Sequence, residues 1–280
     1  MDRKLRKILA AATALCTAVL LAGGCVTPQS SREETAAALD RVLAGGTRTE
    51  ANRARDIYRH PRETLLFFGV RPELRVAEIW PEPGWYTEIL APLLKTSGHY
   101  LAVTMAPNPE SKYITETEAR FDGFLTEHAA DFGTVERSSL GSSGADIAAP
   151  GSLDLILTFR NLHNWLEDGS APQVIASFFR ALKPGGVLGV EDHRAAPGAP
   201  VDEKARNGYV NEDYAVRLIE SAGFRLVAKS EINSNPNDTK DYEQGVWTLP
   251  PTFRLGNKDR ERYAAIGESD RFTLKFVKPR

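Results

Sequence analysis

Cysteine is almost absent from this chain of 280 residues, and both cysteines, Cys16 and Cys25, lie within the first 25 residues. The rest of the chain therefore has no disulfide, and its stability must come from packing. It also has no thiol that could act as a catalytic nucleophile. The five histidines are scattered without the spacing of metal ligands, so we predict no metal site.

Runs of basic residues are missing after the N-terminus. Four basic side chains against one acid give the first 25 residues a net charge of +3, from Arg3, Lys4, Arg6, Lys7 and Asp2. The whole chain carries −2, so the remainder carries −5. Nucleic-acid binding depends on a basic face, so we predict no nucleic-acid partner. Hydrophobic residues make up 42% and charged residues 26%, which is typical of a globular domain.

The first 25 residues have the pattern of an export signal. A basic start is followed by an apolar stretch over residues 8–22 and then by small residues before Cys25. The ending Leu21-Ala22-Gly23-Gly24-Cys25 resembles a bacterial lipobox, in which the cysteine thiol carries the lipid. The alternative is an uncleaved anchor, but an apolar run of about 15 residues is shorter than the roughly 20 that span a bilayer.

We therefore predict an exported protein that is attached through a lipid on Cys25 to a membrane, on the periplasmic face. Val26 follows this cysteine, where an aspartate would retain a lipoprotein at the inner membrane of enteric bacteria. Its absence favours the outer membrane. Residues 26–50 are rich in small and hydroxyl side chains and predict a tether, with a helical patch over residues 33–43.

Residues 51–280 alternate strand-like and helix-like segments, which predicts one α/β domain. The predicted strands are residues 75–79, 100–105, 134–137, 153–159, 187–190, 224–230 and 271–277. The predicted helices are residues 53–68, broken or bent by Pro61, and residues 86–94, 110–132, 173–182 and 212–222. Residues 233–269 form a long irregular insertion, which is typical either of a lid or binding loop or of a surface brace.

Three segments resemble the motifs of class I S-adenosylmethionine (SAM)-dependent methyltransferases. Residues 76–85 are similar to the first strand and its glycine-rich turn, and residues 154–165 to the fourth strand and its loop. Residues 181–188, with Lys183-Pro184-Gly185-Gly186, are similar to the turn before the fifth strand. More narrowly, residues 53–279 resemble a family of exported predicted methyltransferases, through residues 63–70, 160–165, 245–251 and 267–271.

The resemblance implies a Rossmann-like fold with a seven-stranded, mostly parallel sheet and an antiparallel last strand. SAM would bind at the carboxyl ends of the strands. The cofactor contacts that the resemblance implies are Glu78, Trp80, Gly84, Thr104, Asp146 and Ile147. The alternatives are that Trp80 packs in the core and that Asp146 is a solvated loop acid.

The glycine-rich turn and the second strand depart from the family pattern. Trp80 and Glu82 replace glycines, Pro83 stiffens the turn, and Thr104 stands near the position of the usual ribose-binding acid. Glu82 would repel the carboxylate of SAM, because two like charges about 4 Å apart cost about 4 kcal/mol at an effective dielectric of 20.

The candidate catalytic residues follow the fourth and fifth strands in predicted loops, and are Arg160, Asn161, His163, Asp192 and His193. His163 is the first candidate for a general base because imidazole titrates near pH 6.5, and His193 is the second. Asp192 would orient one of them, Arg160 would hold an anionic substrate, and Asn161 would bind polar groups or brace the loop. The alternative is a structural hydrogen-bond network among the same side chains.

The sequence thus predicts an exported SAM-dependent methyltransferase that acts on a small molecule. Arg160-Asn161-Leu162-His163 stands where amino methyltransferases have Asp/Asn-Pro-Pro-aromatic, which favours O- or C-methylation. The alternative is an exported ligand-binding or scaffolding protein that keeps the fold without catalysis. Export supports this alternative, since SAM is made in the cytoplasm.

Overall fold

The protein is described here by a computed structural model over residues 28–280, and its centre is one seven-stranded sheet. The strands are β1 Arg75–Ile79, β2 His99–Met105, β3 Val135–Leu140, β4 Leu153–Phe159, β5 Leu182–His193, β6 Arg225–Ser230 and β7 Arg271–Val277. Their order is β3-β2-β1-β4-β5-β7-β6, and β7 runs antiparallel to β5 and β6. This topology confirms the predicted mostly parallel α/β sheet with an antiparallel last strand.

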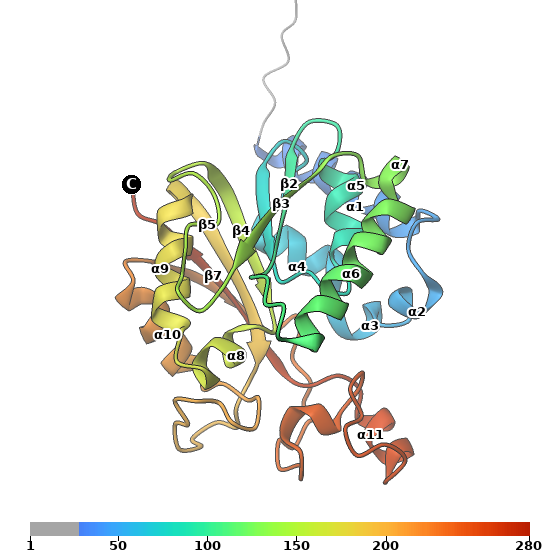
Figure 1. Ribbon diagram of the computed structural model, residues 1–280, viewed down its shortest axis with the longest axis vertical. Helices are drawn as coiled ribbons and strands as arrows, with labels where there is room; N and C mark the ends of the chain where they lie inside the picture. Colours follow the sequence, from blue (N-terminus) through green and yellow to red (C-terminus); the bar gives the residue numbers. More distant parts are fainter. Residues whose placement is uncertain (1–27) are drawn as a thin grey trace, which may run out of the picture.

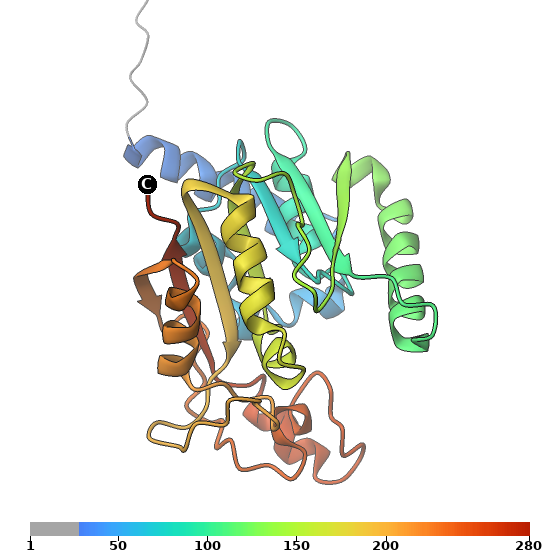
Figure 2. The same cartoon turned by 60° about the vertical axis from the view of Figure 1, so that its left-hand side comes forward.

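Helices cover both faces of the sheet (Figure 1 and Figure 2). They are α1 Pro28–Ala44, α2 Glu50–Arg53, α3 Asp56–Arg59, α4 Pro61–Phe68, α5 Thr87–Leu94, α6 Lys112–Glu127, α7 Ala129–Phe132, α8 Leu162–Glu167, α9 Ala171–Ala181, α10 Glu212–Ser221 and α11 Arg260–Ile266. Helices α1, α4, α5 and α6 contribute to one apolar core, and α8, α9 and α10 contribute to the other.

The central strands β1 and β4 are buried on both faces. Successive side chains of β1 enter opposite cores, since Ala77 and Ile79 face the α9 side and Val76 faces the α5 side. A strand of this kind requires apolar residues at nearly every position, which makes it easy to predict. The bounds of β1, β4 and β7 accordingly agree with the sequence prediction to the residue.

Among the segments that differ from the predicted elements, two lie close to the site. The helix expected over residues 53–68 is divided into α2, α3 and α4, with Pro61 as the first residue of α4. At that position the missing N–H of proline has no intrahelical partner to lose. Strand β5 starts at Leu182 rather than Val187 and continues to His193, so it carries more of the site than expected.

The N-terminal helix α1 belongs to the folded domain. The sequence predicted a tether over residues 26–50 with a helical patch over residues 33–43, and Pro28–Ala44 forms a longer helix that packs against α4 and α5. Leu39 is fully buried in the same core as α4 and α5. The predicted export signal and Cys25 lie outside the described residues. Across residues 28–280, every helix is too short or too polar to cross a bilayer.

Candidate functional site

A cavity of about 540 Å³ opens at the carboxyl ends of β1, β4 and β5. The strand order reverses between β1 and β4, which is where open α/β sheets bind ligands. The structure brings Trp80, Arg160, His163 and His193 together around this cavity, although they lie far apart in the sequence. This position agrees with the site predicted at the strand ends.

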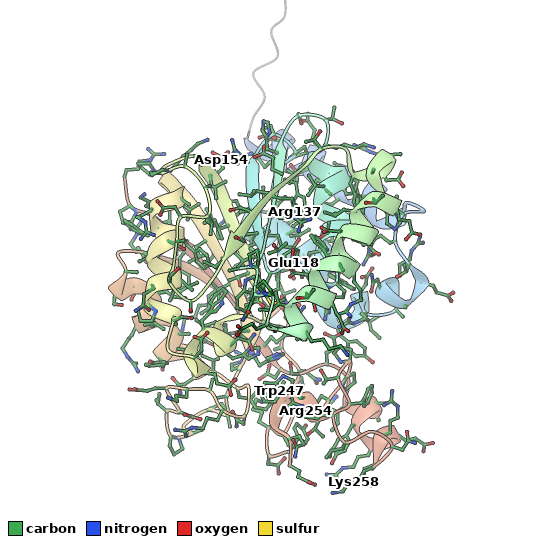
Figure 3. All side chains as sticks on the ribbon, viewed as in Figure 1. Glu118, Arg137, Asp154, Trp247, Arg254 and Lys258 are labelled. Atoms are coloured by element: carbon green, nitrogen blue, oxygen red, sulfur yellow. The ribbon has the colours of Figure 1, made fainter. Side chains whose placement is uncertain are left out.

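The insertion over residues 233–269 forms one wall of the cavity. Trp247 lines it, and the guanidinium of Arg254 lies 4.3 Å from the centroid of the Trp247 ring system (Figure 3). The insertion is also tied to the domain, because the Tyr209 hydroxyl donates to Asp238 at 2.9 Å. The segment therefore lines the cavity and is also braced against the rest of the domain.

Asp192 orients His163. The backbone N–H of His163 donates to Oδ2 of Asp192 at 2.9 Å, and ring Nδ1 of His163 lies 2.9 Å from Oδ1. An ionised Asp192 accepts only, so it selects the tautomer with Nδ1–H and leaves the lone pair on Nε2. His163 was expected in an exposed loop, but it lies in α8 and is only 4% exposed.

His193 lies beside this pair. Its ring centroid is 5.1 Å from that of His163, and its backbone N–H donates to Oδ1 of Asp192 at 2.7 Å. Its ring Nδ1 forms a hydrogen bond with the Ser269 hydroxyl. Burial and the adjacent His163 hold the pKa of His193 well below its ordinary value, so this ring is neutral at pH 7.

The same three residues are close enough to bind a metal ion. Ligand atoms of His163, Asp192 and His193 lie within 4.8 Å of one another, a proximity that sequence spacing did not indicate. However, both oxygens of Asp192 already accept hydrogen bonds from the histidines, and the charges of Arg160 and Arg271 lower the pKa of His193 after burial and His163. This positive surrounding disfavours a cation at these three residues.

Asn161 and Arg160 have different surroundings. The Asn161 amide donates to the Ile79 carbonyl at 2.9 Å and to the Thr158 hydroxyl at 3.2 Å, so it braces the ends of β1 and β4. The Arg160 backbone is left-handed, with φ of 60°, and its guanidinium lies 3.4 Å from Glu191. Arg160 lines the cavity, as expected for a residue that contacts substrate.

Sequence reasoning missed an arginine–glutamate cluster. Glu268 lies 2.7 Å from Arg55, 3.0 Å from Arg59 and 3.1 Å from Arg271. Burial opposes ionisation of Glu268, but the charges of Arg59 and Arg271 outweigh it and lower its pKa to about 2. Arg55 and Arg59, four residues apart before and within one short helix, were the available signal.

Comparison with known proteins places this arrangement in a familiar fold. No protein-family model and no curated protein matches the chain. A SAM-dependent methyltransferase from Aquifex aeolicus is 14% identical with a TM-score of 0.54, covering 80% of this chain and 93% of its own. The [4+2]-cyclase SpnF is 16% identical with a TM-score of 0.57, covering 84% and 86%. The chain has the class I methyltransferase fold. At such identities the likeness shows the fold alone, not the substrate.

Other structures with this fold agree. A putative sarcosine dimethylglycine methyltransferase from Galdieria sulphuraria is 14% identical with a TM-score of 0.53, covering 82% of this chain and 91% of its own. SAM-dependent methyltransferases are thus prominent among the structural neighbours, while SpnF is described by a different reaction.

Two glutamates stand at the end of the first strand: Glu78 is buried within β1, and Glu82 is half-buried in the turn that follows. Burial raises the pKa of Glu78 to about 8, even though Tyr100 donates to it at 2.6 Å. Burial and the neighbouring Glu118 raise the pKa of Glu82 to about 7. Glu118 in turn lies 2.9 Å from Arg137 (Figure 3). Both glutamates line the cavity, and within residues 28–280 Oε1 of Glu82 is buried without a hydrogen-bond partner.

Trp80 packs against Trp165 and also lines both cavities. Its Nε1–H donates to the Leu140 carbonyl at 3.3 Å, and its ring packs edge-on against Trp165 at 5.5 Å. It also borders a second cavity of about 370 Å³ at the ends of β2 and β3. Gly84, with φ of 102°, is required by packing, because a Cβ there would approach Phe124 to 2.4 Å.

The remaining predicted cofactor residues lie outside both cavities. The Thr104 hydroxyl donates to the Ser138 carbonyl at 3.4 Å, and Asp146 pairs with Arg180 at 2.6 Å. Ile147 is 2% exposed in the core of the α9 side. The structure therefore does not bring these three side chains to either cavity.

The second cavity nevertheless has polar groups of the kind that bind a nucleoside such as that of SAM. Two polar atoms at its wall, Nε1 of Trp165 and Oγ of Ser170, are buried without a partner among the described residues. They match the acceptors and donors on the edge of adenine. In the main cavity, Glu82 offers an acceptor to the ammonium of SAM and Arg55 offers a donor to its carboxylate. The donor set thus fits the cofactor, with Trp80 between the two ends.

Proposed function

We propose that the protein is a SAM-dependent methyltransferase that methylates an oxygen or carbon nucleophile of a small molecule. The observation that carries this proposal is the Asp192–His163 pair at the wall of the cavity, in the fold of class I methyltransferases. A base held in one tautomer beside an open cavity suits the removal of a proton from a hydroxyl or an acidic carbon.

The residues of the chain have distinct roles in this proposal. Bound SAM supplies an electrophilic methyl group, and Glu82, Trp165 and Ser170 would hold it. Nε2 of His163 accepts the proton from the substrate, and buried Asp192 stabilises the imidazolium that forms. General-base catalysis of this kind contributes about 10²–10⁴-fold, and positioning of the substrate supplies the remainder.

The test is the variant His163→Gln, assayed for S-adenosylhomocysteine release with small hydroxylated acids as acceptors. We expect turnover to fall by about 10²-fold or more because the amide cannot accept the proton. Binding of S-adenosylhomocysteine should change little. His99→Gln, whose side chain is 61% exposed, is the matched control and should retain turnover. A variant that melts at a lower temperature but retains turnover would show that His163 only ties α8 to β5.

A second candidate is a ligand-binding protein without catalysis. The observation that favours it is Trp80, which replaces the first glycine of the turn and is fixed by its bond to Leu140. The fold itself does not decide between a methyltransferase and a ligand-binding protein, since a [4+2]-cyclase has the same fold. Binding of SAM without release of S-adenosylhomocysteine, for every acceptor offered, would support this candidate.

We also propose that the protein is exported and attached to a membrane through a lipid on Cys25. Support comes from the basic start, the apolar stretch over residues 8–22 and the small residues before this cysteine. The localisation on the periplasmic side, with the outer membrane favoured, follows from the same segment. The mass of the N-terminal peptide tests this proposal.

A further inference from the structure

Positive charge is in excess at one end of the cavity. Four guanidinium groups meet there, and within the described part of the chain they are contacted by two carboxylates. The guanidinium groups are those of Arg55, Arg59, Arg160 and Arg271, and the carboxylates are those of Glu191 and Glu268. Arg271 is 1% exposed and lies within 3.2 Å of both carboxylates. It therefore takes up part of their negative charge, and only the rest can offset the three arginines that line the cavity.

Two of these arginines have donors to spare. Nε of Arg55 donates to Glu268 at 2.7 Å, but its Nη2 is buried and has no partner among residues 28–280. The side chain of Arg160 is 22% exposed, and its described contact with Glu191 is long, at 3.4 Å. Its left-handed backbone is a conformation that the surrounding structure must impose.

The charges also repel one another. Burial and the charge of Arg160 together lower the pKa of Arg59 to about 9, and the effect of Arg160 exceeds the opposing effect of Glu268. A bound anion would offset both the lost hydration and the repulsion. A guanidinium fork matches a carboxylate with two parallel hydrogen bonds, so this chemistry is the best match.

We propose that Arg55, Arg59 and Arg160 bind the carboxylate of a small organic acid. The inference rests on the proposed methyl transfer for the source of this carboxylate, which is either the amino-acid part of the methyl donor or the molecule that receives the methyl group. The proposal specifies a negatively charged ligand for this end of the cavity, where the sequence analysis had identified only Arg160.

The test is calorimetric titration of the full chain with two matched pairs of ligands. S-adenosylhomocysteine is compared with its carboxamide, which keeps the nucleoside and the ammonium but has no carboxylate, and benzoate is compared with benzamide. We expect at least one carboxylate to bind about tenfold or more tightly than its neutral counterpart. A preference within the first pair assigns the site to the methyl donor, and a preference within the second assigns it to the acceptor.

Arg55→Gln and Arg160→Gln should each remove about tenfold of that preference. Arg160 supports little of the surrounding structure, so its variant tests the site even if Arg55→Gln melts at a lower temperature. Arg62→Gln, on the exposed side of α4, should keep the preference. The proposal is overturned if neither carboxylate is preferred, or if the preference persists in both variants. Loss of all nucleoside binding with a retained benzoate preference would reject the methyl-donor site and leave the anion site standing.

Discussion

Glu78 and Glu82 place two carboxyl groups in the wall of a cavity that also holds arginines. Burial is the main cause that raises the pKa of Glu78 to about 8 and that of Glu82 to about 7. A protonated Glu82 carries no charge, so the repulsion of the cofactor carboxylate expected from the sequence is reduced near neutral pH. The sequence identified the acid but could not give its protonation, which depends on the burial of Glu82 and on the neighbouring Glu118 of α6.

Glu78 should make stability depend on pH. The pKa of Glu78 is about 8 in the folded protein against an ordinary value of 4.5, so the folded state binds more protons between these values. The free energy of unfolding of the wild type should therefore fall as pH rises through that window and level off above it. Glu78→Gln keeps an acceptor for Tyr100 and removes the titration.

Denaturant unfolding at several pH values checks this prediction. The variant Glu78→Gln and the wild type should be similar near pH 4, and the variant should be more stable near pH 9, by an amount of the order of 4 kcal/mol. Glu116→Gln, at an exposed site of α6, should follow the wild type. Parallel curves for Glu78→Gln and the wild type at all pH values would contradict the buried, protonated state of Glu78.

At the scale of elements, burial on both faces made β1 and β4 predictable, whereas short helices were not. Helix α8 spans only Leu162–Glu167, and Asn161 at its start makes no side-chain cap, because its amide bonds to Ile79 instead. Arg55 meets Glu268 across 213 residues of sequence, a pairing that no local pattern indicates. The sequence therefore predicted a site at the strand ends but identified only one of the four arginines that meet there, Arg160.

The turn between β1 and α5 gives a test of what its glycine does. Gly84 has φ of 102°, and a Cβ there would lie 2.4 Å from the Phe124 ring. Gly84→Ala should therefore lower the free energy of unfolding by about 1–3 kcal/mol through strain and overpacking. Gly123→Ala, inside α6 with no heavy atom within 4 Å of the added Cβ, should raise it by up to about 1 kcal/mol. Thermal melts of both variants without ligand test this prediction. Equal changes in melting temperature would show that the Phe124 ring moves aside for the added Cβ.

At the scale of the whole molecule, α1 begins at one end of the sheet and the insertion with α11 lies at the other (Figure 1 and Figure 2). The cavity lies at the carboxyl ends of the strands, beside the insertion. Only residues 26 and 27 separate Cys25 from the start of α1 at Pro28. Three residue steps span at most about 10 Å, so a lipid on Cys25 would hold the domain close to the bilayer with the cavity facing away.

This anchor leads to the last prediction. Mass spectrometry of detergent-extracted protein should show an N-terminus at Cys25 with added acyl mass, and Cys25→Ser should release the protein from the membrane fraction. Cys16→Ser is the matched control, because Cys16 lies within the segment that cleavage removes. Trypsin added to the intact membrane form should cut slowly at Arg41, since α1 is folded and Leu39 is buried in the core. An intact N-terminus or cleavage at another residue would reject the lipid anchor. Rapid release by trypsin would support the flexible tether that the sequence predicted.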